Sequence, residues 1–68
     1  MTVIEISRHN AGHPIPIGRV ATKHEYTETE IGEVANESGG MDDLTSLGDW
    51  DGPEDYEWTG DEVFEIVD

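Results

Sequence analysis

The fold is decided at the start of the chain, where Thr2–Ser7 has the sequence TVIEIS. β-branched residues dominate this stretch, and strict alternation places Ile4 and Ile6 on one face, which predicts a half-buried strand. A turn-forming segment follows, and a second β-branched stretch then occupies Ile15–Thr22. We expect these two stretches to pair as an antiparallel hairpin with a loop of about six residues.

The second stretch contains two residues that constrain its place in a sheet. Pro16 has no N–H to donate to a ladder, so this strand is expected either to lie at a sheet edge or to begin only after the proline. The apolar phase shifts from Ile15 and Ile17 to Val20, and the shift occurs across Gly18, which predicts a β-bulge there.

The middle of the chain is less decisive. Residues 28–36 satisfy a helical apolar stripe and a strand alternation about equally well, and both remain open because a short apolar run has no unique period. Beyond the Gly39–Gly40 break, Met41, Leu44 and Leu47 recur at helical spacing, with two aspartates in the first turn. A short helix near 41–47 is therefore predicted, since acids complement the positive end of a helix dipole.

The C-terminal residues alternate again. Asp55–Trp58 and Glu62–Val67 flank the turn-like Thr59–Asp61, which predicts a second β-hairpin. The expected fold is a small, mainly-β (α+β) single domain with an N-terminal and a C-terminal hairpin and one short helix. It is partly irregular, and its thin core leaves open that it lies extended on a partner. The predicted core comprises Val3, Ile4, Ile6, Ile17, Val20, Leu44, Leu47, Trp58, Phe64 and Ile66.

Charge is distributed unevenly along the chain. Residues 1–24 carry three basic residues and one acid, which makes them a near-neutral to basic hairpin segment of charge +2. Residues 25–68 carry 16 acids and no Lys or Arg, and we treat them as the acidic segment of the same domain. The net charge of −14 disfavours direct binding to nucleic acid or to an anionic membrane.

Several classes of site are not expected. The chain has no cysteine, which excludes disulfides and cysteine-ligated zinc. It has no apolar run of about 18 residues and no basic, apolar leader at Met1–Ser7, so neither a spanning helix nor a signal peptide is expected. His9, His13 and His24 are interpreted as surface histidines and not as a metal site. With no phosphate-binding loop or nucleophile–base motif, we expect no catalytic residue, no cofactor and no enzymatic activity.

One stretch has the composition of a protein-binding site. Aromatic side chains alternate with acids there, and such a surface suits a basic partner because rings make cation–π contacts while carboxylates pair with Lys and Arg. Trp58 is assigned to the core, whereas Trp50 remains open between partner contact and local packing. The predicted partner-binding residues are Asp49, Trp50, Asp51, Asp55, Tyr56 and Glu57.

Two functions fit these features. The first is a structural accessory protein of a larger assembly in a salt-adapted host, such as a capsid decoration or other minor virion protein, found in the virion or the host cytoplasm. Its composition is similar to that of high-salt proteins, in which salt screens the repulsion between carboxylates. The alternative is a viral DNA mimic that inhibits a restriction, CRISPR, RNA polymerase or nucleoid protein. The accessory protein would turn its acids toward solvent, whereas the mimic would concentrate them in the interface.

Overall fold

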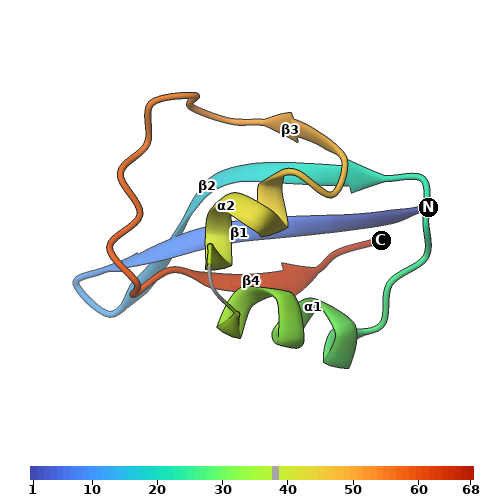
Figure 1. Cartoon of the computed structure of the whole chain (residues 1–68). Helices are drawn as coiled ribbons and strands as arrows, with labels where there is room; N and C mark the ends of the chain where they lie inside the picture. The colour runs from blue at the N-terminus through green and yellow to red at the C-terminus, as the bar shows by residue number, and fades with distance from the viewer. Residues whose placement is uncertain (38) are drawn as a thin grey trace.

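An antiparallel sheet with two short helices on one face forms the molecule (Figure 1). The computed structural model describes residues 1–37 and 39–68. The strands follow the order β3-β2-β1-β4 in the sheet. This confirms a small α+β, mainly-β fold. The elements in chain order are β1 (Thr2–Asn10), β2 (His13–Thr22), α1 (Glu28–Asn36), α2 (Gly40–Thr45), β3 (Asp49–Asp51) and β4 (Val63–Ile66).

The N-terminal hairpin is confirmed, but its turn is tighter than the sequence predicted. Ala11 and Gly12 form a two-residue turn, with φ values of 54° and 81°. Two successive residues with positive φ match the twist of the flanking strands, so pairing extends to the turn itself. The bulge near Gly18 is also confirmed: Ile6 pairs with Gly18 and Ser7 with Pro16, which leaves Ile17 as the extra residue of β2.

The position of β2 explains how the sheet accommodates Pro16. β3 pairs only with Arg19–Ala21, so the half of β2 that contains Pro16 is an edge, as predicted. Proline is tolerated at a sheet edge because its missing N–H can lie on the side without a neighbouring strand.

The core lies between the sheet and the helices. Ile4 sits between Val20 and Ile66 on the neighbouring strands, and Ile31 and Leu44 from α1 and α2 cover this face. Among the described residues, five hydrophobic side chains are fully buried, and each contributes roughly 1.5–3 kcal/mol relative to exposure. The predicted core is confirmed except for Val3, which is half-buried and lies outside this cluster. The prediction did not include Ile31, which is buried in the core.

The ambiguous segment 28–36 forms helix α1. Thr27 is its N-cap: the Thr27 hydroxyl accepts from the Glu30 N–H at 3.2 Å, and the Glu30 carboxylate accepts from the Thr27 N–H at 2.9 Å. This capping box satisfies two N–H groups that the first turn leaves without helical partners. The short helix predicted near 41–47 is confirmed as α2, and Leu44 is its buried residue.

The predicted C-terminal hairpin is wrong. Residues 55–58 form no strand, and β4 pairs with β1 instead. β1 provides a longer partner whose alternation already matches, since Ile4 faces Ile66 and Ile6 faces Phe64 on the core side. Pairing of β4 with β1 buries the apolar side chains of both strands against the helices. This favours it over the predicted hairpin between residues 55–58 and 62–67.

Residues 52–62 are irregular, although a strand was predicted at 55–58, and the chain as a whole is compact and not extended. Its radius of gyration is 11.1 Å, close to the roughly 11 Å of a compact domain of this length. These dimensions are those of a compact domain.

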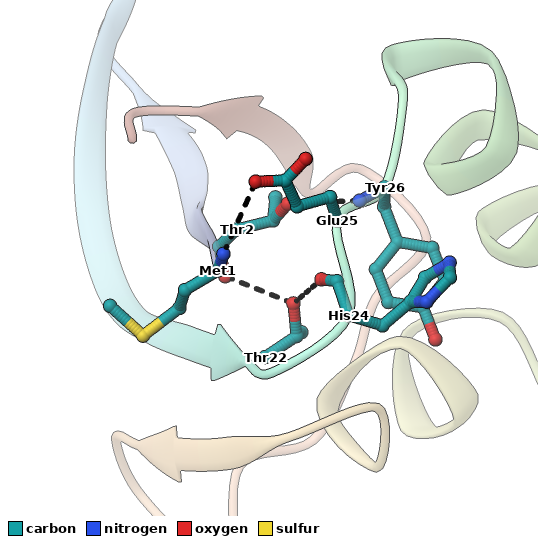
Figure 2. A network of polar contacts seen from close by, with 6 residues as sticks. All are labelled: Met1, Thr2, Thr22, His24, Glu25 and Tyr26. Atoms are coloured by element: carbon teal, nitrogen blue, oxygen red, sulfur yellow. Dashed lines mark hydrogen bonds and ion pairs between the residues drawn. The ribbon is translucent and has the colours of Figure 1, made fainter.

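A polar network joins the open end of the hairpin to the segment before α1 (Figure 2). The Thr22 hydroxyl lies 2.6 Å from the His24 carbonyl oxygen and 3.1 Å from that of Thr2, and the Tyr26 N–H donates to the Thr2 hydroxyl at 2.9 Å. Both threonines are buried, so these bonds satisfy groups that burial would otherwise leave without partners. The network fixes where α1 begins relative to the sheet.

Candidate protein-binding surface

The predicted binding stretch begins on the short edge strand β3. Trp50 lies opposite Val20 of β2, and its half-buried ring packs over Gly18 and Gly52, where a side chain would collide with it. The Trp50 indole N–H donates to the Pro53 carbonyl oxygen at 3.0 Å. Trp50 is thus packed locally, and only part of its ring is available to a partner.

Three aromatic rings form a continuous cluster. The Trp50 and Trp58 centroids are 5.9 Å apart in an edge-on arrangement, and the Tyr56 and Trp58 centroids are 4.7 Å apart. Such pairs add roughly 0.5–1.5 kcal/mol beyond the area they bury. The assignment of Trp58 to the core is consistent with its contact with the buried cluster, although its side chain is only half-buried.

The acids of the same stretch are more exposed than its aromatic rings. Asp49, Asp51, Asp55 and Glu57 are all exposed, whereas Trp50 and Tyr56 are half-buried. The six predicted residues thus combine half-buried aromatic rings with exposed carboxylates. Their contact with a partner stays a prediction.

Carboxylates extend well beyond that region. Of the 17 acids, Glu5 is half-buried and Glu62 is buried, while the other 15 are exposed. Within the described residues, two ion pairs form: Arg19 with Glu5 at 3.0 Å, and the Met1 ammonium with Glu25 at 3.6 Å. Most of the acidic surface therefore has no basic side chain beside it.

Glu62 differs from the exposed acids because it is buried, and the sequence analysis did not identify it. Its carboxylate accepts from the N–H of Gly60 at 2.9 Å, and from the N–H and hydroxyl of Thr59 at 2.9 and 3.0 Å. Burial raises the pKa of Glu62, but the hydrogen bonds together lower it by more than burial raises it. The pKa of Glu62 therefore lies below its ordinary value. The T-x-x-E spacing of Thr59 and Glu62, the same as in the capping box of Thr27 and Glu30, was the available signal.

A pocket of about 650 Å³ lies beside Glu62, between the end of α1, the start of α2 and the segment that leads into β4. Its walls are mainly apolar and aromatic. We call it the Trp58 pocket, and its principal lining residues are Ala35, Met41, Trp58, Glu62, Val63 and Phe64. The sequence contained no signal for it, because the segments that line it are distant along the chain.

The histidines occupy other positions. His9 and His13 are exposed near the turn of the hairpin, and His24 packs edge-on against Tyr26. Among residues 1–37 and 39–68, no three His, Asp or Glu side chains are grouped closely enough to bind a metal ion. No helix in that part of the chain is both long and apolar enough to cross a membrane.

No protein-family model, curated protein or solved structure matches this chain.

Proposed function

We propose that this chain is a non-enzymatic protein-binding component of a larger assembly that is adapted to high salt, such as a minor structural or capsid decoration protein. It would act in the virion or in the host cytoplasm. The observation that carries the proposal is the distribution of its acids, 15 of which are exposed.

The acids lie on both layers of the fold. Glu28, Glu30 and Glu33 are exposed on α1, and Asp42 and Asp43 are exposed on α2. On the sheet, Asp49, Asp51 and Glu65 are exposed as well. Dispersion of this kind suits a protein that works in concentrated salt, where screening beyond a few ångströms removes most of the mutual repulsion.

A DNA mimic would require a different arrangement. A mimic concentrates carboxylates in a rigid row, because duplex DNA carries one charge per roughly 1.7 Å of its axis. Across the sheet, Asp51, Arg19, Glu5 and Glu65 occupy neighbouring positions on successive strands. Arg19 interrupts this row and pairs with Glu5, which weakens support for mimicry.

Exposed apolar side chains and a free sheet edge offer a partner surface outside the carboxylates. Val63 and Val67 are exposed, and β4 has no strand beside its outer edge within the described part of the chain. Main-chain pairing and apolar contacts are not weakened by salt. An interface of this kind would persist at the ionic strength that the acidic surface favours.

The test is replacement of the four exposed acids of the predicted binding region, Asp49, Asp51, Asp55 and Glu57, by Asn or Gln in one variant. Under the proposal, this variant still incorporates into the natural assembly, and the wild-type complex survives molar salt. Native purification of the assembly, with quantification of the bound chain, measures both.

A mimic would behave in the opposite way. Its affinity would fall steeply on neutralisation, since removal of one member of a buried charge pair costs about 2–5 kcal/mol. Salt would dissociate the wild-type complex, and duplex DNA would compete for the partner. Competition by duplex DNA would overturn the proposal.

A further inference from the structure

We propose that the Trp58 pocket receives an arginine side chain of the partner protein. This inference rests on the proposed function, because it identifies where on this chain a partner is bound. It assigns recognition to a site different from the predicted stretch at residues 49–57.

The walls of the pocket suit the stem of a long basic side chain. Ala35, Met41, Val63 and Phe64 provide apolar surface from α1, α2 and β4. Arg and Lys bury their methylene stems along such surface while the charged group finds polar partners. The volume of about 650 Å³ falls in the roughly 300–1,000 Å³ range of small-ligand pockets.

The charge of the pocket is negative. The Glu62 side chain lines it at 7% residue exposure, and the lowered pKa of its carboxyl keeps it ionised at neutral pH. The groups that contact this carboxylate, from Thr59 and Gly60, are neutral N–H and O–H donors. A buried ion ordinarily has a counter-charge, and here no full positive charge is beside it in the described residues.

The three basic side chains of the chain lie elsewhere. Arg19 pairs with Glu5, while Arg8 and Lys23 each line a different surface hollow. A positive charge in the Trp58 pocket would thus have to come from a partner.

Trp58 is held in place before any ligand arrives. Its indole N–H donates to Asp42 Oδ1 at 3.0 Å, which fixes the ring and places a second carboxylate close to the pocket. A ring that is already fixed loses little freedom on binding. Trp58 is half-buried and lines the pocket, and Trp is the strongest aromatic for contact with a cation.

The two helix ends at the pocket do not reverse its charge. The last turn of α1 contains no basic residue, so its negative dipole end is not neutralised by its own side chains. The opposite, positive end of α2 is offset by Asp42 and Asp43 in its first turn.

Arginine fits this combination better than lysine or a metal ion. A planar guanidinium stacks on an aromatic ring and is more weakly hydrated than an ammonium group. A divalent cation requires several oxygen ligands, whereas the walls here are mostly apolar.

The experiment is a titration of the ¹⁵N-labelled full chain with a blocked glycyl-arginyl-glycine peptide. The matched control replaces arginine with citrulline, which keeps the planar end group but removes its charge. We expect saturable shifts of the Trp58 indole and the Gly60 amide, and about tenfold tighter binding of the arginine peptide.

Three variants test the location. Ala35→Met fills the pocket without changing charge and should weaken arginine binding by about tenfold. Asp42→Asn removes a charge near the pocket but keeps an oxygen that can accept from Trp58, and it should weaken binding several-fold. Asp49→Asn makes the same change on β3 and should leave binding unchanged; the amide spectrum of each free variant verifies its fold.

Equal affinity for the citrulline peptide would overturn the inference, as would shifts confined to Asp55 and Tyr56, or equal losses in the two Asp→Asn variants. The titration reports on the pocket alone, whereas incorporation of the wild-type chain into an assembly reports on the proposed function. If the wild type and Ala35→Met incorporate equally, the inference fails while the proposed function stands. If the titration succeeds but the wild type enters no assembly, the proposed function fails.

Discussion

Replacement of Glu62 by Gln should destabilise the protein at neutral pH. The Glu62 carboxylate accepts bonds from both the N–H and hydroxyl of Thr59 and from the N–H of Gly60. A glutamine has one oxygen to accept them, and its amino group would face a donor. The substitution therefore removes at least one hydrogen bond and makes the others neutral.

The size of the effect follows from these bonds. Hydrogen bonds to a charged group contribute roughly 1.5–3 kcal/mol each, and an unsatisfied buried group costs about 1–3 kcal/mol. We expect the free energy of unfolding to fall by about 2–3 kcal/mol. That is a large share of the roughly 3–10 kcal/mol expected for a domain of 68 residues.

The effect should depend on pH with a defined sign. The pKa of Glu62 in the folded protein lies below its ordinary value of 4.5. Its contribution is therefore fully present above pH 4.5 and is lost as the pH falls through the lowered folded pKa. Acid also changes the net charge of the whole protein, so only the difference between wild type and variant isolates Glu62.

Urea unfolding of both proteins between pH 7 and about pH 3 measures that difference. Glu57→Gln is the matched control, since it removes the same charge from an exposed side chain. The difference for Glu62→Gln should shrink as the pH falls, whereas that for Glu57→Gln should be small throughout. A Glu62→Gln variant as stable as wild type at pH 7, or a difference that grows in acid, would refute the reasoning.

Three further predictions concern the whole fold. The thermal midpoint should rise as monovalent salt approaches the molar range, because screening relieves repulsion within residues 25–68; a flat or falling midpoint would contradict this. Gly18→Ala should destabilise by about 1–3 kcal/mol, because its Cβ would collide with the Asp51 carbonyl oxygen and lie 2.7 Å from the Trp50 ring. Gly32→Ala should stabilise by about 0.5–1 kcal/mol, because glycine is unfavourable inside a helix and the new Cβ would be in ordinary contact with Phe64 at 3.8 Å. Urea midpoints of the two variants should move in opposite directions. Thr27→Ala should remove the N-cap of α1 and lower the free energy of unfolding by about 0.5–2 kcal/mol. Urea unfolding followed by circular dichroism measures this, and an unchanged midpoint would contradict it.

The N-terminal hairpin was predictable because its determinants are local. Alternation in Thr2–Ser7, the proline and glycine of β2 and the intervening turn each act within a few residues. Only the length of the turn was overestimated. Alanine rarely adopts positive φ, so the sequence did not indicate that Ala11, at φ 54°, would form a two-residue turn with Gly12.

The segment 28–36 could have been predicted better. Thr27 and Glu30 form the S/T-x-x-E/Q spacing of a capping box, which favours a helix beginning at residue 28 over a strand. Apolar periodicity alone left the two equal because Ile31 satisfies both patterns. The cap residues carried the information that the period did not.

The fate of residues 55–62 could not be derived from local patterns. Pairing of β4 with β1 joins residues about 60 apart, and nothing within the C-terminal segment indicates that β1 offers a free edge. The contact of Trp58 with Asp42 is similarly distant, so alternation around Trp58 suggested a strand that does not form.

That misplaced strand also explains how the Trp58 pocket arises. In a hairpin, the backbone of residues 55–58 would be bonded to β4 along its length. With β4 paired to β1, this segment is free to cross toward the helices, where Trp58 reaches Asp42 and Glu62 closes the turn before β4. The place where local sequence rules fail is the place where aromatic, acidic and apolar groups converge, and such failures concentrate at functional or strained sites. The contacts of Trp58 and Glu62 that complete the fold therefore also shape the pocket. For any substitution of Trp58 or Glu62, stability and arginine binding must be measured separately.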